Sequence, residues 1–378
     1  MKYWIQCVLF VLLFFFFSLP AWANSQTEEY VGETLDEIGD TLEEAIPDEA
    51  EELLAALDLT DLNLQQILSL RPEQFFELLT EQFFIQWKEP VAVLGQILGV
   101  LLLTAMLGPL KESILKQNSA WLFSFVALIC LCTVFSEPVV LCVEDTMESM
   151  ERCSKFLLSL IPVLGAILTV GGQAATAGGY QLILFTVCQL VSQLAVSTAL
   201  PLMSIYFALS MISGIFSDLG LQGLVGGIKN LVCWGLGIVT TLFVGVLSLQ
   251  TFVSSNVDVV TLKASRFLMG SFIPVVGSIL SEAFGAAQGC LSLIRSTVGT
   301  FGVIAALCIL LPVLLRVSLW YFITWAALQL SALLQVKELD GLLKGANNTF
   351  AILLALLLCF FLLMVVATTV VIFIGTGG

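Results

Sequence analysis

The sequence predicts an all-α fold: a polytopic helical membrane protein with tandem parallel repeats and re-entrant or kinked helix pairs. Composition is the first observation, because 58% of the 378 residues are hydrophobic, 11% are charged and the mean hydropathy is +1.02. Soluble domains carry near 25% charged residues. The second observation is the recurrence of apolar runs long enough to cross a hydrocarbon core of about 30 Å. The third is a segment of about 15 residues that occurs twice in similar form, from Ser154 and from Ser265.

Residues 1–23 have the pattern of a secretory signal peptide. Lys2 precedes a run rich in Phe and Leu from Cys7 to Leu19, and small residues at Ala21 and Ala23 follow. This order predicts cleavage after Ala23. The alternative is an uncleaved first membrane helix. Both interpretations place the following segment outside the cytoplasm.

Residues 24–89 form an acidic extracytoplasmic region with helical periodicity. They carry 18 Asp and Glu against Arg71 and Lys88, a net of −16, whereas residues 90–378 carry 11 acids and 11 bases. Such charge repels anionic headgroups and suits a basic protein or divalent cations, or it belongs to a solvated stalk. An aromatic stripe is expected to lie on the membrane surface or against the bundle; it consists of Phe75, Phe76, Leu79, Phe83 and Trp87.

The repeated phrase reads SKFLLSLIPVLGAIL from Ser154 and SRFLMGSFIPVVGSIL from Ser265. Prolines that open hydrophobic helices recur with it, and GLLKGANN from Gly341 ends in the last of three matched polar breaks. These matches predict units with a period of about 111, since lipid-facing composition alone does not supply matched Pro, Gly and Asn. The units are repeat 1 at 90–200, repeat 2 at 201–311 and a partial repeat 3 at 312–378. The opening prolines are Pro90, Pro201 and Pro312.

Each full unit is expected to contain a short apolar segment with an interior proline. Pro162 and Gly165 in the first copy correspond to Pro274 and Gly277 in the second, and the segments cover about 156–172 and 267–284. A proline removes one helical hydrogen bond and clashes with the preceding turn, so these are predicted helix breaks. The segments read either as re-entrant hairpins lining a cavity or as tightly packed, kinked helix pairs.

Polar side chains inside the apolar runs are the candidate site residues. A stripe on one helical face of the first unit either hydrogen-bonds a neighbouring helix or lines a pore. At an offset of 111, Thr186 pairs with Thr297 and Gln189 with Thr300. Arg295 lies in the same second-unit segment. The candidates are therefore Thr186, Gln189, Gln193, Ser197, Arg295, Thr297 and Thr300.

Catalytic and metal-binding motifs are missing from the sequence. The chain has no His, which removes the commonest general acid or base, and no CxxC pair, Walker loop, GxSxG or HExxH. Most of its 10 Cys lie in apolar runs, where thiols behave as small hydrophobes. We therefore expect no enzymatic activity, no catalytic or metal-binding residues and no cofactor.

Basic residues predict the orientation. A first span that runs inward from an exported head places several lysines on the cytoplasmic side, as the positive-inside rule requires. Four basic residues would fall outside and anchor interfacial links by snorkelling. The inner set is Lys111, Lys116, Lys229, Lys337 and Lys344, and the outer set is Arg152, Lys155, Lys263 and Arg266.

In its signal, acidic head and repeated phrases, the chain resembles the stage III sporulation protein AE family of endospore-forming bacteria. The resemblance implies a component of the assembly that links mother cell and forespore, needed for late forespore development. It also implies partners, namely the other membrane proteins of that complex and a forespore-side protein, and a location in the mother-cell membrane around the forespore.

Two functions of different class remain open. One is a structural or pore subunit of an oligomeric, membrane-embedded conduit without nucleic acid partners. The other is a self-contained secondary transporter or permease with a substrate site at the repeat interface, where Arg295 and the broken helices would act.

Overall fold

The computed structural model describes residues 38–39, 42, 45–59, 66–67, 71–114, 120–194, 197–198, 200–215, 220–272, 277–336 and 338–373. The expected signal peptide at 1–23 lies outside these residues, as do Lys116, Lys337 and Pro274. Every long element in the described part is a helix, which confirms the all-α prediction. The helices are α3 (Asp48–Ala56), α5 (Pro72–Gln86), α6 (Lys88–Ile114), α7 (Ala120–Val170), α8 (Ala174–Leu194), α9 (Leu200–Ile215), α10 (Gln222–Phe272), α11 (Gly277–Leu333) and α12 (Asp340–Phe373).

Six stretches are long and apolar enough to cross a membrane, and a shorter apolar helix covers Pro201–Gly214. This confirms the prediction of a polytopic membrane protein. Two of the six, Phe125–Val170 and Gln288–Leu333, are 46 residues long. At 1.5 Å per residue each extends about 69 Å, more than twice the hydrocarbon core of a bilayer. The bundle is therefore longer than a single membrane is thick.

Helix α7 corrects the predicted division of the first unit. The segment at about 156–172 was expected as a short separate piece, yet it continues one helix of 51 residues that also includes a charged link at 144–155. Helical ion pairs across the link support its continuity, with Glu148 bonded to Arg152 at 2.6 Å and Glu151 to Lys155 at 3.0 Å. The link thus forms charged helical turns between two apolar stretches.

The prolines of the predicted repeats occupy two kinds of position, either at the start of a helix or in its interior. Pro90 and Pro201 lie in the first turns of α6 and α9, where a missing amide hydrogen costs nothing. Pro162 and Pro312 lie inside α7 and α11, so the expected break at Pro162 and the expected helix start at Pro312 are corrected. A membrane bundle tolerates such prolines because neighbouring groups satisfy the freed carbonyls.

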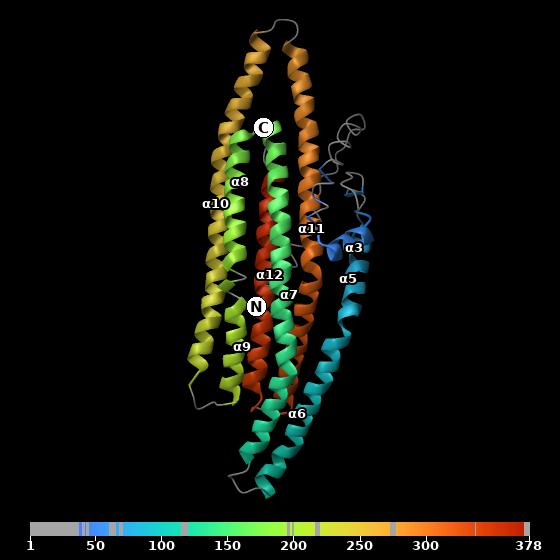
Figure 1. The fold of residues 1–378 in the computed structure, drawn as a ribbon, viewed down its shortest axis with the longest axis vertical. Helices are drawn as coiled ribbons and strands as arrows, with labels where there is room; N and C mark the ends of the chain where they lie inside the picture. The colour runs from blue at the N-terminus through green and yellow to red at the C-terminus, as the bar shows by residue number, and fades with distance from the viewer. Residues whose placement is uncertain are drawn as a thin grey trace.

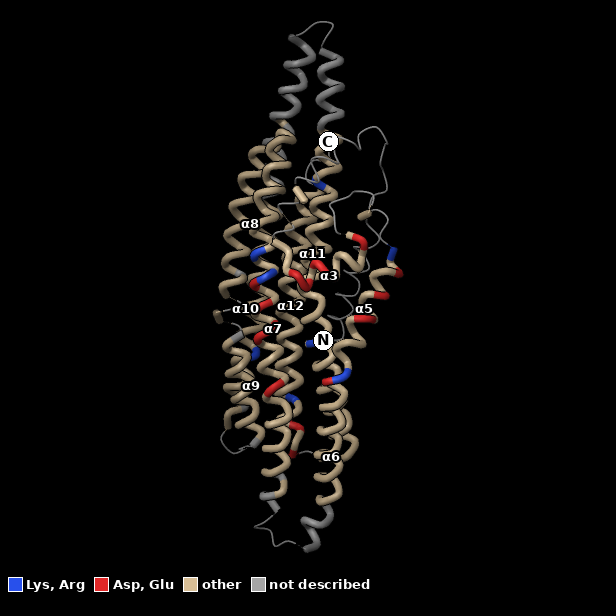
Figure 2. The backbone as a smooth tube through the Cα atoms, turned by 45° about the vertical axis from the view of Figure 1, so that its right-hand side comes forward, with Lys and Arg blue, Asp and Glu red and all other residues tan. Residues whose placement is uncertain are grey.

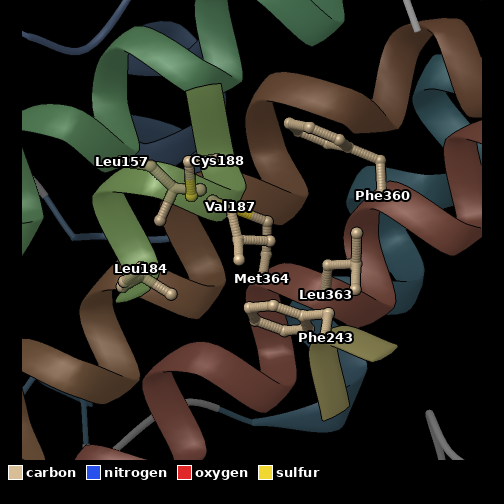
Figure 3. A pocket seen from close by; sticks show the side chains of 8 residues that line it. All are labelled: Leu157, Leu184, Val187, Cys188, Phe243, Phe360, Leu363 and Met364. Atoms are coloured by element: carbon tan, nitrogen blue, oxygen red, sulfur yellow. The ribbon is translucent and has the colours of Figure 1, made fainter. Parts of the chain in front are cut away.

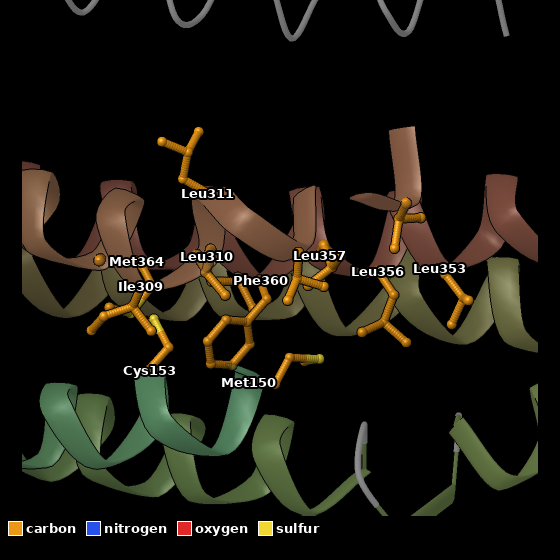
Figure 4. Close-up of a cluster of buried hydrophobic side chains, with 14 of the residues drawn as sticks. Met150, Cys153, Ile309, Leu310, Leu311, Leu353, Leu356, Leu357, Phe360 and Met364 are labelled. Atoms are coloured by element: carbon orange, nitrogen blue, oxygen red, sulfur yellow. The ribbon is translucent and has the colours of Figure 1, made fainter. Parts of the chain in front are cut away.

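Helix α12 forms the centre of the bundle and packs against α7, α9, α10 and α11 (Figure 1). Beside it, α7 and α10 run upward in the view, whereas α8, α9 and α11 run downward. Buried side chains from α7, α11 and α12 interdigitate where Met150 and Cys153 face Ile309, Leu357 and Phe360 (Figure 4). The core is apolar along this length.

Glycines allow some helices to approach closely. A Cβ added at Gly345 of α12 would lie 2.7 Å from the Cβ of Ser210 on α9, and one at Gly302 of α11 would lie 2.6 Å from Leu160 Cδ2 on α7. Small residues at such crossings are the usual means of tight helix packing in membranes.

The described part of the acidic region docks against the middle of the bundle. Helix α3 packs on α11, and the guanidinium of Arg152 on α7 donates to Glu49 on α3 at 2.7 Å. Figure 2 shows charged residues at the level of α3 and further down the bundle, beside α9 and above the lower end of α6. Within the aromatic stripe on and just after α5, Phe76 is exposed and the other members are half-buried, so the stripe is only partly covered by the bundle.

Candidate functional site

The four polar candidates of the first unit share one outer face. Thr186, Gln189 and Gln193 lie on α8, Ser197 follows shortly after its end, and all four are exposed. The hydroxyl of Thr186 donates to the carbonyl of Leu182 at 2.7 Å, and the amide of Gln193 donates to Ser197 Oγ at 3.0 Å. These four side chains are therefore not buried within the described bundle.

The opposite face of α8 is buried. Ala177, Tyr180, Leu184 and Cys188 recur at helical spacing and lie inside the bundle. The Tyr180 hydroxyl donates to the carbonyl of Ala367 on α12 at 3.2 Å. This buried face fixes the rotation of α8 about its axis and so fixes which side chains point outward.

The second-unit candidates lie in a different environment. Arg295, Thr297 and Thr300 on α11 are all buried, with 6%, 2% and 8% of their surface exposed. Arg295 donates from Nη1 to the side-chain oxygen of Gln173 at 3.1 Å, and its buried Nε has no hydrogen-bond partner. Gln173 follows Gly172, whose φ of 79° turns the chain between α7 and α8. Arg295 thus ties α11 to this turn through a neutral side chain.

The structure does not bring the two groups of candidates into one described site, since the first group is exposed and the second is buried. Gly165 is buried against α8, where an added Cβ would overlap the side chain of Gln181 at 1.8 Å from Nε2, whereas Pro162 is exposed. In the second copy of the phrase, Gly277 is the first residue of α11.

Two polar contacts were not predicted from the sequence. Arg316 forms an ion pair with Asp145, which joins α11 to α7. Lys229 donates to Asn348 at 2.8 Å, which joins α10 to α12. Asn348 ends the last of the three matched polar breaks, and Lys229 lies in the second, LQGLVGGIKN from Leu221, so the repeat was the sequence signal that could have indicated this pairing.

A pocket opens between α7, α8, α10 and α12 (Figure 3). Its lining is entirely apolar and includes Leu157, Cys188, Phe243 and Met364. No group of three or more His, Cys, Asp or Glu that could hold a metal occurs in the described residues. This pocket offers no polar group that could orient a solute.

The fold and these side chains define a polytopic α-helical membrane protein whose polar groups either tie helices together or face outward from the bundle. The chain belongs to the stage III sporulation protein AE family, whose model matches residues 58–375. This membership confirms the resemblance found in the sequence and places the chain among sporulation proteins.

A relative named stage III sporulation protein AE, from Bacillus subtilis strain 168, is 27% identical over 248 residues. The match covers 64% of this chain and 60% of the relative, so less than two thirds of the relative's length is matched. No solved structure matches the chain.

Proposed function

We propose that the chain is a membrane component of a multiprotein channel or secretion-like complex that connects mother cell and forespore and is needed for late forespore development. Family membership carries the sporulation role. The outward polar face of α8 supports an assembled state, because polar side chains on a membrane helix are stable against protein or water and costly against lipid.

The proposal places the chain in the mother-cell membrane around the forespore, with a cleaved signal peptide and the acidic region outside the cytoplasm. Its partners are the other membrane proteins of the complex and a forespore-side protein. The order of the helices supports the tandem repeat. Repeat 1 contains α6, α7 and α8, and repeat 2 contains α9, α10 and the first part of α11. The partial repeat 3 contains the rest of α11 and α12. The chain acts by shape and association, without catalysis or a cofactor.

The second candidate is a self-contained secondary transporter. One observation favours it: Arg295 is a buried cation with a single neutral partner, and ionisable groups inside membranes often mark substrate sites. The pocket between α7, α8, α10 and α12 does not include Arg295 in its lining.

Affinity purification of the tagged chain from sporulating cells separates the two candidates. A conduit subunit is expected to co-purify with other membrane proteins of the sporulating cell in fixed proportion. Purification as a lone chain that moves a small solute across liposomes would support the transporter and refute the conduit.

A further inference from the structure

The outer face of α8 is a surface without a protein neighbour in the described bundle. Two of its apolar members, Leu182 and Phe185, are 71% and 55% exposed, and they alternate with hydroxyl and amide side chains. We define this outer face by six exposed residues: Leu182, Phe185, Thr186, Gln189, Leu190 and Gln193.

Lipid is a poor cover for this outer face. In hydrocarbon the amide of Gln189 would lose its hydrogen bonds to water without gaining others of equal quality, and the amide of Gln193 would keep its bond to Ser197 Oγ but lose those to water. The helix is also the least apolar of the six candidate spans, with a mean hydropathy of 1.4 against 2.1 to 3.2 for the others. A protein surface that supplies both apolar contacts and hydrogen bonds fits the outer face better.

Within the same chain, the corresponding positions are covered by protein. Thr297 and Thr300 of α11 match Thr186 and Gln189 at an offset of 111, and they are buried in the bundle. The face of the repeat that carries these residues is thus buried on α11 in the second unit and exposed on α8 in the first. The helices of this chain can therefore pack over such a face.

The charge and chemistry of the outer face favour a second copy of the chain. The sequence of α8 contains no charged residue, so two copies facing each other meet no like-charge repulsion. A glutamine amide carries both a donor and an acceptor and can pair with its own equivalent across a two-fold axis. A charged partner would find no side chain of opposite charge on α8 to pair with.

We propose that the outer face of α8 is the contact between two copies of this chain, with Gln189 and Gln193 hydrogen-bonded across the pair. The contact rests on the assembly role proposed above and identifies one partner in that assembly. It also gives the exposed stripe a specific task, which is to hold subunits together.

Site-specific photo-crosslinking of the full chain in lipid vesicles tests the contact. p-Benzoylphenylalanine in place of Gln189 is expected to yield a covalent dimer on illumination. In a mixture of isotopically light and heavy chains, the crosslinked peptides should both come from α8. The matched control carries the same probe in place of Leu242, which is 62% exposed on α10 and should crosslink to lipid. Crosslinks from position 189 to lipid alone, or equal dimer yields from both positions, would overturn the proposal.

A second measurement uses the double variant Gln189→Leu with Gln193→Leu, which keeps the helix and makes the outer face more compatible with lipid. Loss of hydrogen bonds across the pair should raise the dissociation constant of the dimer about tenfold, measured by single-molecule photobleaching at varied protein-to-lipid ratios. An unchanged dissociation constant would contradict the contact. A monomeric wild-type chain would refute it while leaving co-purification with other subunits, and hence the proposed function, standing.

Discussion

The guanidinium of Arg152 on α7 lies 2.7 Å from the carboxylate of Glu49 on α3, 103 residues away in the sequence. This ion pair connects the acidic region to the charged turns in the middle of α7.

Arg152→Gln should loosen the acidic region without unfolding the bundle. The side chains of Arg152 and Glu49 are 32% and 72% exposed, so the pair contributes below about 1 kcal/mol. Limited proteolysis should cut between α3 and α5 several-fold faster in the variant. Lys155→Gln is the control, because Lys155 pairs with Glu151 on its own helix. Equal cleavage rates in both variants would show that the pair does not hold α3.

Gly345→Ala should destabilise the bundle by about 1–3 kcal/mol, because the new methyl group would press on Ser210 Cβ and force α9 and α12 apart. Thermal unfolding in detergent measures the effect. Gly99→Ala is the matched control, since an added Cβ there meets nothing within 4 Å. If the control lowers the unfolding temperature as much as Gly345→Ala does, close packing at this crossing is not the cause.

Replacing the two arginines of α11 by leucine should give opposite results. Arg316→Leu leaves Asp145 without its ion-pair partner and should cost about 1–2 kcal/mol, less than for a fully buried pair because both side chains are partly exposed. Arg295→Leu removes a buried cation that has no carboxylate among its described contacts, so stability should stay equal or rise.

Thermal unfolding of both variants, with spore counts of the corresponding strains, checks this contrast. A strong loss of stability in Arg295→Leu would mean that the cation has an anionic partner. Normal stability with a low spore count would instead assign Arg295 a role in function.

The proposed orientation predicts the response to protease added outside protoplasts of non-sporulating cells that carry the chain in their plasma membrane. The region 24–89 should be removed, whereas the end of α6 around Lys111 should be protected because it faces the cytoplasm. Immunoblots with tags at each place measure the outcome. A protected acidic region together with cleavage near Lys111 would reverse the orientation.

Much of the fold could be predicted from composition and period. The apolar runs predict membrane helices, and the spacing of Thr186, Gln189 and Gln193 predicts one helical face. The continuity of α7 was missed because the charged link reads as an interruption. Its glutamates and basic residues are good helix formers that pair at i,i+4, and this keeps the helix intact.

The burial of the candidates could not be predicted from local pattern. Thr186 and Thr297 occupy matched places, yet one is exposed and the other buried, because burial depends on which helices pack around each unit. The partner of Arg295 is 122 residues away, and nothing in the local spacing of Gln173 indicates it. Such contacts arise from tertiary packing.

The central claim is that this chain works as one subunit of a multiprotein membrane complex. The most direct test is to measure the size and composition of that complex in sporulating cells. Blue-native electrophoresis of mildly solubilised membranes, followed by mass spectrometry of the band, should place the 40.9 kDa chain in a much larger complex with other membrane proteins. A band of the chain alone, from cells that form spores normally, would contradict the account.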